Sequence, residues 1–189
     1  LIKNFISNGS KLFYLIIIGC IPISIVGLLG KGFIESMFNN NISLLPYTFM
    51  LTGIFLFIAK DFNGEKKLTL KIVLIVGILQ CLALFPGVSR SGITIASLLF
   101  LGINHKDAVR FSFLMAIPLI LGAVFLTIDF SNYNINALGH MIFGSIISFL
   151  FGLGAIYLTN NLLKDKKYWL FSIYCFIISF VVFIWNLIL

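Results

Sequence analysis

The chain has 189 residues, of which 60% are hydrophobic and 10% are charged, and its formal net charge at pH 7 is +7. Soluble globular domains carry about 25% charged residues, so this composition, with a mean hydropathy of +1.13, excludes an ordinary soluble domain. The positive charges form no dense basic run, which argues against a nucleic-acid partner and favours cytoplasmic loops of a membrane protein. The sequence therefore predicts an all-α, polytopic transmembrane helix bundle.

Apolar runs long enough for membrane helices recur along the chain. About 20 apolar residues cross the ~30 Å hydrocarbon core, and we expect a single membrane domain over residues 1–189. Its spans should be residues 12–30, 42–59, 111–128, 137–158 and 169–189. Pro22 and Pro118 should kink two of them, and the glycines of 137–158 predict close helix packing. Charged loops are expected at 60–71, 103–110 and 164–167, and a polar loop at 129–136.

Residues 72–101 are divided into two short apolar arms by the polar stretch Pro86-Gly87-Val88-Ser89-Arg90-Ser91-Gly92-Ile93-Thr94. Pro and Gly end the first arm, and a second arm of about 11 residues would be about 16 Å long, half a bilayer. A count of Lys and Arg by loop puts all of them except Lys31 and Arg90 on the cytoplasmic side, provided that this segment leaves and returns on one side. We therefore predict a re-entrant pair of half-helices whose tip lies near the membrane midplane.

The tip carries a charge that needs a partner. An Arg at the middle of a membrane costs at least about 2.5–3.5 kcal/mol, and every Asp and Glu of the chain falls in an expected loop or at a span end. The partner of Arg90 is then a ligand or a part of the protein outside this chain. A guanidinium suits phosphate, and the helix that starts at Ser89 to Ser91 offers an anion-binding N-terminus. Ser91, Thr94 and Ser97 place hydroxyls along one face, so we predict a site for a lipid phosphate or another anion.

Other polar residues have simpler interpretations. Ser97 is expected to bond its own backbone, as Ser and Thr commonly do in membrane helices. Gln80, in the first arm, either forms a hydrogen bond between helices or is a site residue. His105 and His140 are expected at the surface or at an interface, and the three cysteines as packing residues without a disulfide. No cluster of His, Cys and carboxylates has metal-ligand spacing in the sequence.

The run from Gln80 to Thr94, QCLALFPGVSRSGIT, resembles the second signature of the undecaprenyl-diphosphate phosphatases, also known as bacitracin-resistance proteins. The segment 108–118 is similar to the family's Phe-Ser-Phe-Leu and Ile-Pro pattern, and residues 18–22, followed by Gly27, resemble another family stretch. The resemblance covers nearly all of the chain. It implies a multi-pass enzyme of the bacterial inner (plasma) membrane that hydrolyses undecaprenyl diphosphate to undecaprenyl phosphate and inorganic phosphate, which recycles the lipid carrier for cell-wall synthesis.

The resemblance also implies a fold of two inverted repeats, each with a re-entrant pair, of which 72–101 would be the second. It implies that a divalent cation, Mg²⁺ or Ca²⁺, supports activity, and it leaves a homodimer open. The residues that we expect in the site are the catalytic Arg90, Ser89 and Thr94 and the substrate-binding Gly87, Ser91, Gly92 and Gln80.

The family's first signature, a Glu-rich half-helix ending in Pro-Ile-Ser-Ser-Thr-Gly-His, is absent from the sequence and would precede Leu1. It carries carboxylates, a candidate nucleophilic hydroxyl and the His, so we expect these residues to be the C-terminal two thirds of such a protein and inactive alone. A lipid-phosphate flippase is the alternative function, because transporters also bind anions at broken helices near the midplane. A non-catalytic scaffold ranks last because it leaves Arg90 unexplained.

Overall fold

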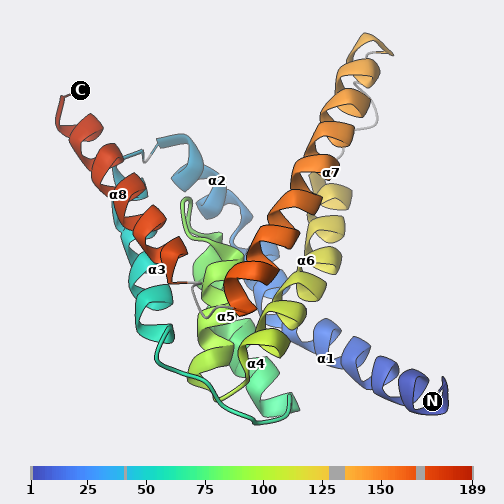
Figure 1. The fold of residues 1–189 in the computed structure, drawn as a ribbon. Coiled ribbons are helices and arrows are strands. Elements are labelled where there is room, and N and C mark those ends of the chain that lie inside the picture. Colours follow the sequence, from blue (N-terminus) through green and yellow to red (C-terminus); the bar gives the residue numbers. More distant parts are fainter. Residues whose placement is uncertain (1, 41, 128–134, 165–168, 189) are drawn as a thin grey trace.

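The computed structural model describes residues 2–40, 42–127, 135–164 and 169–188, and every regular element among them is a helix (Figure 1). The predicted all-α class is confirmed. In chain order the elements are α1 (Ile2–Leu29), α2 (Lys31–Asn40), the 3₁₀ turn η1 (Ile42–Leu44), α3 (Leu45–Ala59), α4 (Leu70–Leu79), the 3₁₀ turn η2 (Gln80–Leu84), α5 (Arg90–Phe100), α6 (His105–Thr127), α7 (Ile135–Lys164) and α8 (Leu170–Ile188).

Four of the described helices are long and apolar enough to cross a membrane, at Ser10–Leu29, His105–Leu126, Gly139–Thr159 and Leu170–Ile188. These segments coincide with four of the expected spans, and the chain is a multi-pass membrane protein. The expected span at 42–59 is different: it consists of the turn η1 and the helix α3, which has 15 residues. At 1.5 Å per residue α3 is about 22 Å long, shorter than a full crossing of the hydrocarbon core.

Several stretches without predicted helix are helical, among them residues 2–11, 105–110 and 31–40. The loop prediction is wrong for residues 105–110, which form the first turns of α6. Asn104 Oδ1 accepts a hydrogen bond of 2.9 Å from the backbone N–H of Asp107, so Asn104 caps this helix. Residues 31–40, for which no element was expected, form α2, with an exposed ion pair of 3.8 Å between Lys31 Nζ and Glu35 Oε1.

The predicted hairpin consists of α4, η2 and α5, whose two arms contact each other. Its first arm ends at a turn in which Gly87 has φ +90°, a conformation that side chains with a Cβ rarely adopt. The second arm, α5, has 11 residues and begins at Arg90, as expected from the sequence. The position of the hairpin in the membrane remains a prediction.

The base of the hairpin is closed by the loop between α3 and α4. The backbone N–H of Lys66 donates to Gly102 O at 3.0 Å, and Gly102 has φ +87°. The two ends of the hairpin therefore lie close together, as the count of Lys and Arg by loop required. His105 Nδ1 lies 2.8 Å from Asn63 Oδ1, and the His105 side chain is buried. The expectation of a surface or interface position is wrong for His105, whereas His140 is exposed.

The core of the described structure is centred on α5. Residues 92–99 of this helix are all buried, because α3, α4, η2 and α6 pack around it. Figure 1 shows α3 and α8 on one side of the hairpin and α1 and α6 on the other. Cys20 and Cys175 are buried and Cys81 is partly buried, as expected of packing residues. The first turn of α5 is therefore held by neighbours on several sides.

Glycines allow α1 and α4 to approach closely. A Cβ on Gly77 would lie 2.5 Å from Gly19 O and 3.0 Å from Pro22 Cγ, and a Cβ on Gly19 would lie 2.9 Å from Val73 Cγ1. The glycines of α7 differ, because a Cβ there would meet no described atom within 4 Å: Gly139, Gly144, Gly152 and Gly154. Close packing at the α7 glycines, which we expected, is thus not found within the described part of the chain.

Candidate anion-binding site at the hairpin tip

The first turn of α5 forms the polar tip of the hairpin. Ser89 is the N-cap residue, and its Oγ accepts a hydrogen bond of 3.1 Å from the Gly92 N–H. Ser91 Oγ lies 3.4 Å from Ser89 Oγ, so the two hydroxyls face each other. Both side chains are half-buried. The tip thus combines two hydroxyls with the positive end of a helix, where backbone N–H groups favour anions.

Two threonines of α3 support this turn from behind. The Ser89 N–H donates to Thr52 Oγ1 at 3.1 Å, and Thr52 Oγ1 donates to Thr48 O at 3.1 Å. Thr48 fills the space beside Gly87, where a Cβ would overlap Thr48 Oγ1. A Cβ on Gly92 would lie 3.0 Å from Thr52 Cγ2. We did not expect these threonines in the site, although their spacing of four residues in an apolar segment placed them on one helix face.

The guanidinium of Arg90 points from the tip toward α6 and is half-buried. Its Nη1 donates to Ala116 O at 3.4 Å, a long bond compared with the usual 2.7–3.2 Å. No ion pair with an acidic side chain is formed by Arg90 among the residues that the structure describes. An Arg side chain has five N–H donors, so most of those of Arg90 remain available to an anion.

Gln80 and Thr94 lie between the two arms, and the exposed fraction of each is 1%. Thr94 Oγ1 is 2.8 Å from Gln80 Oε1 and also 2.8 Å from Arg90 O. Of the two interpretations of Gln80, the structure shows the hydrogen bond between helices. The expectation for Ser97 is wrong, because its buried Oγ has no hydrogen-bond partner among the described residues.

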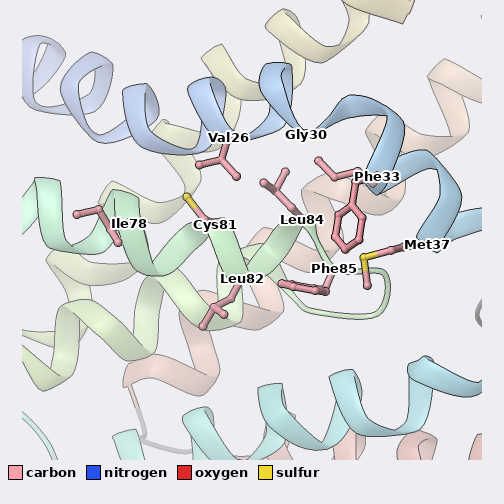
Figure 2. Close-up of a pocket in the computed structure, with 10 residues that line it drawn as sticks. Val26, Gly30, Phe33, Met37, Ile78, Cys81, Leu82, Leu84 and Phe85 are labelled. Carbon is pink, nitrogen blue, oxygen red and sulfur yellow. The ribbon is translucent and has the colours of Figure 1, made fainter.

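An apolar pocket of about 210 Å³ lies beside the first arm of the hairpin (Figure 2). One wall is the end of α1 and α2, with Val26, Gly30, Phe33, Ile34 and Met37, and the other wall is the end of the arm, with Ile78, Cys81, Leu82, Leu84 and Phe85. Figure 2 shows Phe33, Met37 and Phe85 close together at one end of the pocket. Phe85 lines the pocket and is followed directly by Pro86, the first residue of the polar tip. The pocket and the tip are therefore adjacent along the chain.

The described residues do not fit a divalent cation. Mg²⁺ and Ca²⁺ prefer carboxylate and carbonyl oxygens, whereas the tip offers hydroxyls, N–H groups and a guanidinium. Among the residues described, no group of three or more His, Cys, Asp or Glu could hold a metal ion. The donor groups at the tip therefore suit an anion better than a divalent cation.

Comparison with known proteins finds a family model and named relatives that match most of the chain. The family model for bacitracin resistance protein BacA matches residues 2–181, which include the tip. A protein of Methanococcus maripaludis (strain C7) named undecaprenyl-diphosphatase is 38% identical over 185 residues, which cover 95% of this chain and 70% of the relative. Relatives with the same name from Thermosipho melanesiensis (36% over 185 residues, 96% and 70% covered) and Thermotoga petrophila (38% over 168 residues, 87% and 68% covered) match similarly. The chain belongs to the bacitracin resistance protein BacA family.

Proposed function

We propose that the protein hydrolyses undecaprenyl diphosphate to undecaprenyl phosphate and inorganic phosphate. The name of its relatives supports this activity. The observation that carries the proposal is Arg90, a half-buried guanidinium at a helix N-terminus with no acidic partner among the described residues. The same names favour hydrolysis over the flippase that we considered as the alternative.

The polar tip would bind the diphosphate. Two amides of the first turn are already used, since the Ser89 N–H donates to Thr52 and the Gly92 N–H to Ser89 Oγ. The N–H groups of Arg90 and Ser91 remain for phosphate oxygens, together with the guanidinium and the hydroxyls of Ser89 and Ser91. Such fixed donors stabilise the charge that develops on a phosphoryl group in the transition state.

Gly87, Gly92, Thr94 and Gln80 would contribute through the shape of the tip. Gly87 and Gly92 leave room for the threonines of α3, which hold the turn. Thr94 and Gln80 are buried between the arms, so we assign them to the support of the site.

The prenyl chain of the substrate would enter the apolar pocket of Figure 2. Its lining side chains are apolar apart from the Cys81 thiol, and it adjoins the tip through Phe85 and Pro86. A diphosphate at the tip and an isoprenoid in the pocket match the two chemical halves of the lipid.

The rest of the proposal depends on the family resemblance. On this basis we propose that the protein lies in the bacterial inner membrane, where it would recycle the lipid carrier for the cell wall, and that a divalent cation supports its activity. Chelation with EDTA followed by return of Mg²⁺ or Ca²⁺ tests the cation. The mass of the detergent-solubilised protein tests a homodimer.

The deciding experiment follows two products in proteoliposomes. The full gene product that contains residues 1–189 is given undecaprenyl diphosphate, and inorganic phosphate and the distribution of lipid between leaflets are measured together. We expect release of inorganic phosphate. Movement of the lipid between leaflets without release of phosphate would instead support a flippase.

A further inference from the structure

The buried pair of Gln80 and Thr94 has an incomplete set of hydrogen bonds. Gln80 Nε2 has no partner in the described structure, although the exposed fraction of the residue is 1%. An unpaired buried polar group costs about 1–3 kcal/mol. Two apolar side chains of similar shape would avoid this cost. The pair therefore has no evident advantage for the stability of the hairpin.

The hydrogen bonds of the pair lead directly to the site. Thr94 Oγ1 has one hydrogen but lies 2.8 Å from two acceptors, Gln80 Oε1 and Arg90 O. If the amide of Gln80 is turned so that Nε2 donates to Thr94 Oγ1, the hydroxyl donates to Arg90 O and both contacts are satisfied. Bonds then run without interruption from Gln80 to the carbonyl of Arg90, the first residue of α5.

We propose that Gln80 is a positioning residue, which acts through Thr94 to fix the first turn of α5 and so the direction of the Arg90 guanidinium. This inference rests on the phosphatase activity proposed above. Gln80 itself does not touch the substrate, because it is buried between the arms. The first turn is then held from two sides, by Thr52 at the Ser89 N–H and by Thr94 at the Arg90 carbonyl.

The test separates activity from stability. Gln80→Met and Thr94→Val keep the approximate volumes of the side chains but remove the hydrogen bonds, and the double variant leaves neither partner unpaired. In the full gene product we expect the double variant to unfold at the wild-type temperature or above it. We also expect kcat to fall by about 10- to 100-fold with little change in KM, because a displaced catalytic group loses transition-state stabilisation.

Ser97→Ala is the matched control. The Ser97 hydroxyl, one turn further along α5, is buried and has no hydrogen-bond partner among the described residues, so its removal should keep the unfolding temperature and kcat. A second readout is coupling: Arg90→Lys should reduce kcat less in the double variant than in the wild type, because the guanidinium is already misplaced.

Two results would overturn the inference. One is wild-type kcat in the double variant. The other is a fall in kcat that is matched by a fall in the unfolding temperature, since that is the result of a merely structural role. If the double variant does not accumulate, the single variants Gln80→Met and Thr94→Ser decide. Gln80→Met should lose activity, whereas Thr94→Ser should retain it because it keeps the hydroxyl. The reverse result would refute the positioning role of Gln80. A wild-type protein that releases no phosphate contradicts the proposed function before any variants are compared.

Discussion

Thr52 Oγ1 on α3 accepts a hydrogen bond of 3.1 Å from the backbone N–H of Ser89, the N-cap residue of α5. The two residues are 37 positions apart in the sequence, and the bond joins the hairpin tip to a neighbouring helix. The side chain of Thr52 is fully buried. The geometry of the candidate anion site therefore depends on a buried residue of a neighbouring helix.

Thr52→Val should destabilise the protein and reduce its activity. The change keeps the shape of the side chain but removes the acceptor of the Ser89 N–H, which costs about 1–3 kcal/mol when the donor stays unpaired. Unfolding in denaturant and phosphate release measure the two effects. Thr159→Val is the control, because Thr159 bonds its own helix on α7, at Ala155 O. Equal stabilities of the two variants would argue against a role of Thr52 at the tip.

Arg90→Lys should restore little of the activity that Arg90→Ala loses. Lys keeps the positive charge but has no planar fork of donors for two phosphate oxygens. We expect the values of kcat/KM for Arg90→Lys and Arg90→Ala to differ by no more than about tenfold. A tenfold difference corresponds to about 1.4 kcal/mol of transition-state stabilisation. Arg110→Lys, at an exposed position of α6, should keep the wild-type rate. Wild-type kinetics in Arg90→Lys would refute a bidentate contact.

Gly77→Ala should destabilise the protein by about 1–3 kcal/mol, the usual effect of overpacking. Its Cβ would lie 2.5 Å from Gly19 O, a backbone atom that cannot move without separating α1 from α4. Gly122→Ala is the matched change in α6, where a Cβ meets no described atom within 4 Å. It should be neutral or stabilising, because Ala favours a helix over Gly. The unfolding temperatures of the two variants test this prediction. Similar values would contradict a close contact between α1 and α4 at Gly77.

Val26→Trp should weaken binding of long prenyl chains. Val26 lines the apolar pocket beside the tip, and an indole there would occupy the space that we assign to the isoprenoid. We expect KM for undecaprenyl diphosphate in mixed micelles to rise by about tenfold, or about 1.4 kcal/mol, with kcat retained. Ile177→Trp, at an exposed position of α8, is the control. The same KM for Val26→Trp and Ile177→Trp would show that the prenyl chain does not bind in this pocket.

The sequence predicted the tip well because its signals are local. Pro86 and Gly87 end a helix, and a membrane protein tolerates a polar break between apolar arms only where protein or a water-filled cavity surrounds it. The contact between Thr52 and Ser89 could not be predicted, because no local pattern links residues on different helices. The role of Gln80 stayed open for the same reason. The apolar pocket was missed because one of its walls is α2, and the mixed polarity of residues 31–40 gave no helix signal.

Phosphate release by the wild type and Arg90→Ala tests the central proposal most directly. Both forms of the full gene product are reconstituted at equal amounts, undecaprenyl diphosphate is added, and inorganic phosphate is followed with time. We expect release by the wild type and a rate about 10²- to 10³-fold lower for Arg90→Ala, the usual effect of removing one electrostatic donor. Equal rates of phosphate release by the two proteins, or no release by either, would contradict the proposed hydrolysis at Arg90.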